Sequence, residues 1–373
     1  MRRILRTYFP PLPRSVLTLQ AGGLLNAFGN GVVLPFLLIY LHNVRGIDLA
    51  SAGLVVGAHA ASSVVAGPVF GAQIDRIGAK ATLAAALAVL TVGYAGYALV
   101  HEAWHGFLVA VVSGVGAGGF WPAQSTLVAG LTPHWQRPAA FAMQRVVMSL
   151  GIGLGALAGG AIAATDAPGT FVALFLLDAA TFALYAAVML ALVPEPARAG
   201  GHAPGRAGSY REVLRHRPFV AVVGLNALFI FAGFSGFEVL PVYAKNEAGL
   251  AESEIGALFA VNTAVIVLAQ APVARLARGR RRMRTLALLG LTWAAAWLLV
   301  PFAGTSPSAA LWLLAATMAA FALGQSLHGA VSAPLVAGLT PHWQRPAAFA
   351  MQRVVMSLGI GLGALAGGAI AAT

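Results

Sequence analysis

Two acidic residues, Asp178 and Glu238, lie inside long apolar stretches of the sequence. A carboxylate loses its hydration in such a stretch, so an acid there is costly and is a candidate functional group by default. Lost hydration also favours the neutral carboxyl group, so either residue could take up and release a proton or contact a substrate. Glu238 lies near the end of its stretch, where its side chain could instead extend to the membrane surface.

Three basic residues, His59, His328 and Arg145, also lie within apolar stretches. A histidine there can relay protons, but a hydrogen-bonded packing role is the more common one and is favoured for both. Arg145 could bind an anionic substrate. Extension of its guanidinium group to the cytoplasmic surface is the favoured alternative.

Amide side chains interrupt several apolar stretches and are accompanied by phenylalanine and tryptophan. Polar side chains in membrane helices usually face the interior of the bundle. The pattern therefore predicts a central cavity that is aromatic and sparsely charged, which suits amphipathic or weakly polar solutes. The residues expected to line it are Asn26, Asn30, Trp121, Gln124, Asn226, Asn262 and Gln270.

Composition predicts the class of protein that these residues belong to. The chain has 373 residues, of which 59% are hydrophobic and 9% charged, too apolar a composition for a soluble protein. A polytopic, all-α membrane protein is expected, because backbone groups in lipid must be satisfied within each helix. No cysteine is present, which excludes disulfides and thiolate metal sites. No phosphate-binding Gly-x-x-x-x-Gly-Lys-[Ser/Thr] pattern occurs, and we expect no enzyme, cofactor or metal site.

Eleven apolar stretches are long enough to span a membrane as helices. Their predicted cores are Leu17–Tyr40, Ala50–Phe70, Ala81–Val100, Gly106–Leu127, Ala140–Ala164, Thr170–Leu192, Val220–Tyr243, Ile255–Leu276, Leu286–Phe302, Ala309–Val331 and Ala347–Thr373. The basic amino terminus resembles a signal peptide, but no clear cleavage site follows, so the first stretch is interpreted as a retained helix.

The distribution of basic residues orients these helices. All lysines and arginines except Arg45 and Lys245 fall on one side of the predicted bundle. Basic loops remain in the cytoplasm, so the amino terminus is expected there. The same asymmetry accounts for the net charge of +12 without nucleic acid as a partner, and it favours anionic lipid headgroups.

A charged motif, which we expect to form a tight turn, separates the second and third apolar stretches. Its pattern is Gly-x-x-x-Asp-Arg-x-Gly-x-Lys, formed by Gly71, Asp75, Arg76, Gly78 and Lys80. This motif, in this position, resembles the loop signature of the major facilitator superfamily of secondary transporters. The resemblance implies two bundles of six helices, and a gating role in which Gly71 permits close approach to the eleventh helix. It also implies that Asp75 faces a helix amino terminus and that Arg76 tethers a neighbouring helix.

The fifth apolar stretch contains a second motif, with Gly151, Gly155, Gly159 and Gly160. It resembles the antiporter motif of the same superfamily, which has Gly-Pro where this chain has Gly155-Ala156. Glycines four apart also make a smooth face for helix packing, and this simpler role is favoured. The fourth stretch also departs from the pattern of the superfamily, because Ala110 occupies the position where the family's proton-linked arginine is expected.

An internal repeat defines the domain organisation. Residues 335–373 are identical to residues 127–165 at every position, whereas other parts of the two halves show no such identity. We expect a first bundle of six helices at 1–193, a cytoplasmic linker at 194–218 with a short amphipathic helix over 210–217, and a second bundle of five at 219–373. The twelfth helix of the family would be missing, and the second copy is interpreted as a recombined or artefactual end.

These observations together predict a secondary transporter in the cell inner membrane. It would move a small amphipathic or weakly polar solute by alternating access, with proton-coupled efflux as the leading hypothesis. Facilitated uptake of a neutral solute and a truncated, non-transporting protein remain the alternatives. The expected partners are the lipid bilayer, a small-molecule substrate and protons, and the chain is expected to be a monomer.

Overall fold

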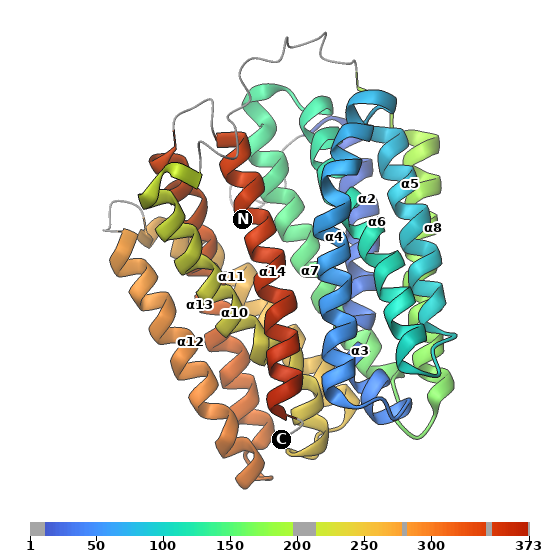
Figure 1. Cartoon of the computed structure of the whole chain (residues 1–373), viewed down its shortest axis with the longest axis vertical. Coiled ribbons are helices and arrows are strands. Elements are labelled where there is room, and N and C mark those ends of the chain that lie inside the picture. Colours follow the sequence, from blue (N-terminus) through green and yellow to red (C-terminus); the bar gives the residue numbers. More distant parts are fainter. Residues whose placement is uncertain (1–11, 197–213, 278–281, 341–344, 372–373) are drawn as a thin grey trace, which may run out of the picture.

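The computed structural model describes residues 12–196, 214–277, 282–340 and 345–371, and within these ranges the chain is helical without strands. The predicted all-α membrane fold is confirmed, and each of the eleven predicted stretches corresponds to a long helix (Figure 1). The first half contains α2 (Arg14–Val33), α4 (Leu49–Ile77), α5 (Ala79–Tyr97), α6 (Ala103–Leu131), α7 (Arg137–Ile162) and α8 (Pro168–Leu192). The second half contains α10 (Arg217–Asn246), α11 (Glu252–Ala277), α12 (Arg282–Thr305), α13 (Ala310–Leu339) and α14 (Arg345–Ala371).

Ten spans among the described residues are long and apolar enough to cross a membrane, while α14 contributes a shorter apolar segment, Val354–Gly367. The first span is interrupted after α2, where Pro35 provides no backbone N–H. It continues as the short helix α3 (Leu37–Ile39) and a π-helical turn, Tyr40–Val44. The Tyr40 hydroxyl donates to the Tyr97 carbonyl at 2.8 Å and so anchors this end of the span to α5.

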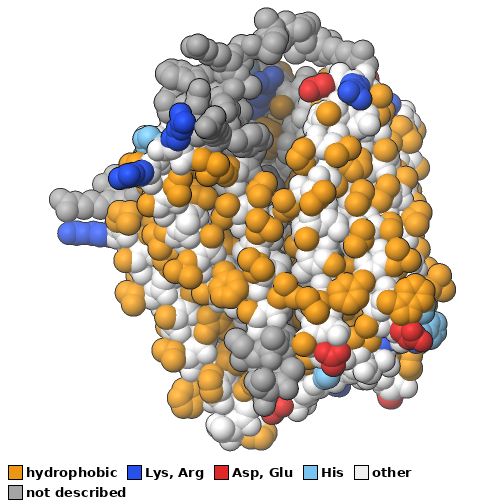
Figure 2. Space-filling model, viewed as in Figure 1, with side chains coloured by type: hydrophobic (Ala, Val, Ile, Leu, Met, Phe, Trp, Pro, Cys, Tyr) orange, Lys and Arg blue, Asp and Glu red, His pale blue; other side chains and the backbone are white. Residues whose placement is uncertain are grey.

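The two ends of the bundle differ in charge. Figure 2 shows Lys and Arg side chains mainly at one end, with a hydrophobic surface below them. We call this the basic end; it contains the described residues near 76–80, 131–137, 193–196, 214–217, 275–277 and 282–284. The opposite end, called the far end, contains the connections near residues 43–48, 98–102, 163–167, 247–251 and 306–309.

Helix packing follows the same plan in both halves, with one exception. In the first half α2 packs on α7, and α8 packs on both α2 and α5; in the second half α10 packs on α14, and α12 packs on α13. The halves meet along two helix pairs, α7 with α11 and α4 with α14 (Figure 1). Among the described residues, no helix lies beside α10 and α12 as α8 lies beside α2 and α5. Leu291, Leu298 and Phe302 of α12 are exposed.

The two identical segments occupy equivalent places. Gly155 of α7 lies against the Phe28 carbonyl and Gly31 of α2, while Gly363 of α14 lies against the Phe231 carbonyl and Ser235 of α10. Each copy therefore turns the same glycine face to the first helix of its own half. Each also reaches the second helix of the opposite half, because α7 packs on α11 and α14 packs on α4.

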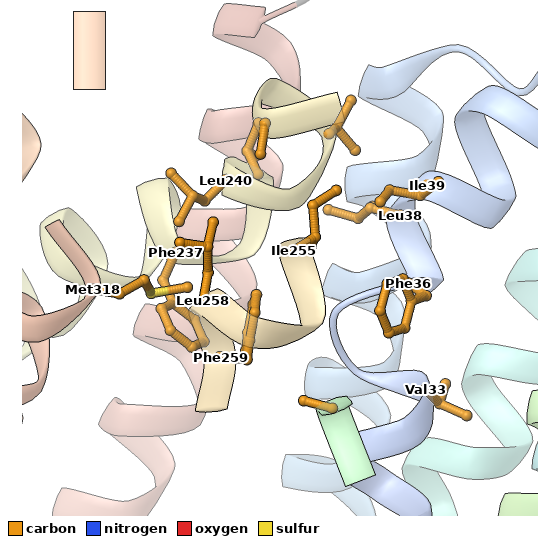
Figure 3. Close-up of a cluster of buried hydrophobic side chains, with 14 of the residues drawn as sticks. Val33, Phe36, Leu38, Ile39, Phe237, Leu240, Ile255, Leu258, Phe259 and Met318 are labelled. Atoms are coloured by element: carbon orange, nitrogen blue, oxygen red, sulfur yellow. The ribbon is translucent and has the colours of Figure 1, made fainter. Parts of the chain in front are cut away.

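The hydrophobic core joins the halves toward the far end. Figure 3 shows Phe36 and Ile39 of the first half beside Ile255, Leu258 and other side chains of the second half, all in one buried cluster. Toward the basic end the buried clusters of the described residues separate. One belongs to the first half and includes Leu12 and Leu127, and the other belongs to the second half and includes Phe219.

Two local predictions need correction or fall outside the described residues. The motif at Gly71–Lys80 was expected to form a turn, but α4 continues through Ile77 and only Gly78 separates it from α5. Gly78 has φ +93°, a conformation that favours glycine. Most of the predicted linker and its amphipathic helix lies at residues 197–213, outside the described residues; α8 ends at Leu192 and α10 begins at Arg217.

Candidate transport site

A cavity of about 240 Å³ lies within the first half. Aromatic side chains form much of its wall, and amide and imidazole groups project into it. Its polar and aromatic lining comes from Asn26, Asn30, His59, Tyr94, Phe120, Trp121, Gln124 and Phe182. The structure thus brings together four of the predicted cavity residues, Asn26, Asn30, Trp121 and Gln124, with His59. Sequence reasoning missed Tyr94 and Phe182, which carry no signal beyond being aromatic residues in apolar stretches.

Several polar groups at this cavity have unused hydrogen-bonding capacity. The Gln124 Nε2 atom and the Tyr185 hydroxyl lie 3.2 Å apart, but the Gln124 Oε1 atom is buried and has no partner among the described residues. The Asn26 Oδ1 atom is in the same situation. Buried polar atoms are normally paired, so these two oxygens are suited to accept hydrogen bonds from a solute or from water. His59 is paired with the Ser113 hydroxyl at 3.0 Å.

The two candidate acids occupy different positions. Asp178 is fully buried on α8, where the Thr181 hydroxyl donates to Oδ1 at 3.2 Å and Oδ2 has no partner among the described residues. It faces Gly29 of α2, behind the wall of the cavity. Glu238 is partly buried on α10. Tyr94, which lines the cavity, lies within electrostatic range of both acids, although neither acid lines the cavity itself.

The remaining predicted cavity residues lie elsewhere in the second half. Asn226 is paired with His328, with Oδ1 2.5 Å from Nε2. Asn262 donates to the Met318 carbonyl at 3.1 Å, which commits its amide nitrogen to packing between α11 and α13. Gln270 is partly buried on α11. In the described part of the chain these residues do not line the 240 Å³ cavity.

Arg145 lies on α7 and its side chain is exposed. Its guanidinium group reaches α13 of the opposite half, where a Cβ placed on Gly329 would lie 2.8 Å from Nη2. The expected extension toward the membrane surface is therefore not what the structure shows. Arg145 instead crosses the boundary between the halves.

The gating motif contacts a segment that sequence reasoning did not anticipate. The Lys80 ammonium group donates to the Leu190 carbonyl at 2.9 Å, and the Lys80 backbone N–H donates to Glu195 at 3.4 Å. The carboxylate at the amino terminus of α5 is thus Glu195, whereas Asp75 is exposed. A Cβ on Gly71 would meet no described atom within 4 Å, so the close approach expected there is absent in this conformation.

The predicted packing glycines of α7 all lie in close contacts. Gly151, Gly155 and Gly159 face α2, and Gly160 faces α11, where a Cβ would lie 3.1 Å from the Gly256 Cα atom. These positions agree with the helix-packing interpretation of the glycine motif.

One metal-like pattern was overlooked in the sequence. Residues His101–His105 read His-Glu-x-x-His, which on a continuous helix would place two imidazoles on one face. Here α6 begins at Ala103, so His101 precedes the helix and Glu102 caps it. Within the described residues, no group of three His, Cys, Asp or Glu side chains could hold a metal ion.

The sequence that builds this site matches the model of a known family. The model of the Major Facilitator Superfamily matches residues 20–309 and 239–373. The chain belongs to this superfamily. The resemblance carried by the Gly71–Lys80 motif is thereby confirmed at the level of family, which is one of transport proteins rather than enzymes.

Two curated bacterial proteins are similar in sequence to this superfamily member. It is 27% identical over 268 residues to multidrug resistance protein MdtH of Escherichia coli, covering 72% of the chain and 65% of the relative. It is 24% identical over 267 residues to the uncharacterized MFS-type transporter YqjV of Bacillus subtilis, covering 70% of the chain and 64% of the relative. The chain thus spans just under two thirds of each relative's length.

Solved transporters share the fold of this superfamily member. A crystal structure of a POT family transporter superposes with a TM-score of 0.77 at 15% identity, covering 96% of the chain and 90% of the transporter. A bacterial homolog of the human lysosomal transporter Spinster, in an inward-facing and unoccupied conformation, gives 0.74 at 18% identity, covering 94% and 81%. At these identities the likeness concerns the fold alone.

Proposed function

We propose that the chain is a secondary transporter that exports a small amphipathic or weakly polar solute in exchange for protons. The observation that carries this proposal is the 240 Å³ cavity, whose walls combine aromatic surface with amide groups that lack partners. Aromatic walls favour apolar solutes, and a few polar groups fix their orientation. The name of the relative MdtH, a multidrug resistance protein, supports export as the direction.

Alternating access would require the halves to open at one end while closing at the other. Buried contacts join the halves toward the far end, and separate clusters toward the basic end suit a state open there. Basic loops favour the cytoplasmic side, so the basic end would face the cytoplasm and the far end the exterior. The packing of α7 on α11 and of α14 on α4 would provide the surfaces on which the halves rock.

Proton coupling would use Asp178. Its buried carboxyl group has one oxygen without a partner, and it lies near Tyr94 in the cavity wall. A change in the charge of Asp178 would alter the electrostatic potential at this wall and hence solute binding, which is how protons and solute would be linked. Glu238 is the second candidate for the same role.

Transport in proteoliposomes tests the proposal. Counterflow of a fluorescent amphipathic solute without a proton gradient would show carrier activity, and an imposed gradient should then drive accumulation. Asp178→Asn should retain counterflow but lose the gradient-driven component. Asp166→Asn, which changes an exposed acid at the far end, is the matched control and should behave as wild type. Gradient-driven accumulation that survives in Asp178→Asn would contradict the assigned proton site, and absence of counterflow in the wild type would contradict the transport function.

A further inference from the structure

A polar cluster in the second half is not used by the proposed cavity. Asn226 of α10 and His328 of α13 are each more than nine-tenths buried and are joined through Asn226 Oδ1 and His328 Nε2 at 2.5 Å. The Asn226 Nδ2 atom is buried and has no partner among the described residues. It therefore offers an unused hydrogen-bond donor, which normally indicates a missing acceptor. A small space of about 10 Å³ beside Asn226, lined also by Ser332 and Gln352, has room for roughly one water-sized group.

Arg145 adds a positive charge to this cluster from the opposite half. It interacts electrostatically with His328, and its guanidinium group lies over Gly329, the next residue of α13. A Cβ at position 329 would lie 2.8 Å from Nη2, so Arg145 packs directly against the backbone of α13 at this glycine. The helices α7, α13 and α14 contain no Asp or Glu, and Glu238 of α10 is twelve residues from Asn226, about 18 Å along a helix. The helix α11, which packs on α7 and α13, contains Glu252 and Glu254 in its first turn, at the far end.

Arg145 connects this cluster with the proposed cavity through its position on α7. Met148 and Ile152 line the cavity and follow Arg145 by three and seven residues on α7. Residues at this spacing lie on one face of a helix, so Arg145 stands on the cavity face, one turn toward the basic end. A solute in the cavity could therefore extend a polar end toward Arg145 while its apolar part remains among the aromatic side chains.

We propose that Arg145 and the amide of Asn226 bind the acidic group of an amphipathic anion, and that a carboxylate is the group they fit. This inference rests on the proposed function and deepens it by naming the class of substrate. Arginine is suited to the task because its planar guanidinium group donates two parallel hydrogen bonds to a carboxylate. The adjacent aromatic cavity takes the apolar part of the same molecule.

Equilibrium binding of two matched probes tests the proposal without relying on transport. The probes are 1-pyrenebutyric acid and 1-pyrenebutanol, which share the apolar part and differ in the acidic group. The protein is held in phosphatidylcholine nanodiscs at neutral pH, and binding is followed by energy transfer from tryptophan to pyrene. Wild type should bind the acid at least about tenfold more tightly than the alcohol, as expected of hydrogen bonds to a charged group. Arg145→Gln should abolish this preference while changing the affinity for the alcohol by less than about twofold.

Arg137→Gln provides a matched control at the start of the same helix. The Arg137 side chain donates to the Ala129 carbonyl at 3.0 Å and is placed away from the cluster, so the preference should persist in this variant. A second set of discs containing phosphatidylglycerol distinguishes a solute from a lipid headgroup. If the preference for the acid is lost only in the discs that contain phosphatidylglycerol, Arg145 binds the lipid headgroup, and the proposal is overturned.

Equal affinities of the two probes in wild type, failure of both to bind, or a preference that survives in Arg145→Gln would also overturn it. These outcomes are separate from failure of transport. A chain that shows no counterflow can still show the binding preference, and a chain that transports uncharged solutes can lack it.

Discussion

Glu252 at the start of α11 accepts hydrogen bonds from Thr165, the residue that ends the first copy of the repeat. The Thr165 backbone N–H donates to Oε1 at 3.1 Å, and the Thr165 hydroxyl contacts the same oxygen. The same carboxylate forms an ion pair with Lys245 at 2.9 Å. Beside it, Asn43 donates to Asn246 at 2.6 Å. The Thr165–Glu252 and Asn43–Asn246 contacts join the halves by polar groups at the far end, whereas the ion pair with Lys245 lies within the second half.

We predict that Glu252→Gln weakens closure at the far end. The substitution removes the charge that pairs with Lys245 and weakens the acceptor of Thr165, at a cost of about 1–3 kcal/mol for a largely buried group. The population open at the far end should rise by roughly five- to a hundredfold, as such a cost implies. Spin labels on cysteines introduced at the exposed far-end positions Gly169 and Ser308, measured by electron paramagnetic resonance, would report a longer distance between the halves.

The matched control is Glu254→Gln on the same helix. Glu254 accepts only a local hydrogen bond, from the Ala251 backbone N–H at 2.8 Å, and does not join the halves. Its distance distribution should equal that of wild type. An unchanged distribution in Glu252→Gln would show that the apolar cluster alone holds the far end closed.

We predict that filling the cavity strongly slows transport while leaving insertion intact. Ala117 lines the cavity, and Ala117→Leu adds three carbon atoms to a space of about 240 Å³ beside Trp121. Solute uptake into proteoliposomes should fall at least about tenfold, because the loss of a snug apolar contact costs 1–3 kcal/mol. Ala142→Leu, at an exposed position on α7, is the control for expression and insertion. Full activity of Ala117→Leu would mean that the solute binds elsewhere.

The positions of Asn26, Trp121 and Gln124 could be predicted from sequence because polar or amphipathic residues in membrane helices turn to the bundle interior. The same rule misplaced Asn262, whose amide is used by the Met318 carbonyl. A sequence pattern cannot show whether a polar side chain faces a cavity or donates to the backbone of a neighbouring helix. Glu195 was missed for a different reason. It meets the amino terminus of α5 only because α8 returns beside α5, a contact across 115 residues that no local pattern contains.

The spans themselves were predictable because length and hydropathy decide them, but conformation was not. Gly71 was expected to meet the eleventh helix, yet the space around a Cβ at that position is empty of described atoms here. Such a contact depends on which end of the bundle is open. Because the same sequence adopts both the open and the closed state at each end, it cannot show which contacts a given state contains. The exact ends of the helices could not be predicted either. Because α6 begins only at Ala103, His101 lies outside the helix, and the His101–His105 spacing does not place the two imidazoles on one helix face.

We predict that the basic end is cytoplasmic. Single cysteines can be introduced without background labelling, since the chain has none. In intact cells, an impermeant thiol reagent should label Gly169→Cys at the far end and leave Gly201→Cys, in the segment between α8 and α10, unlabelled until the cells are opened. The reverse pattern would contradict the charge rule for this chain, and equal labelling would contradict a single orientation.

The two copies of the repeat allow one substitution to be compared in two settings. A Cβ at Gly155 would overlap the Phe28 carbonyl oxygen and lie 2.9 Å from the Gly31 Cα atom. The backbones of α7 and α2 would therefore have to move apart. At the equivalent Gly363 the nearest atoms, the Phe231 oxygen and the Ser235 nitrogen, would lie 3.0 Å away, which a small shift can relieve. We therefore predict that Gly155→Ala destabilises the protein by about 1–3 kcal/mol, as overpacking does, and that Gly363→Ala costs less.

Thermal unfolding of the purified protein in detergent measures this difference, with Gly224→Ala as the control. Gly224 lies within α10 at an exposed position, and a Cβ there would meet no described atom within 4 Å. Alanine should stabilise the helix at that site by about 0.5–1 kcal/mol, because glycine is the poorer helix former. The expected order of unfolding temperature is thus Gly224→Ala highest, Gly363→Ala next and Gly155→Ala lowest. Equal losses at Gly155 and Gly363 would show that the two copies pack equally tightly, and that the looser contact of α14 on α10 is not a property of the protein.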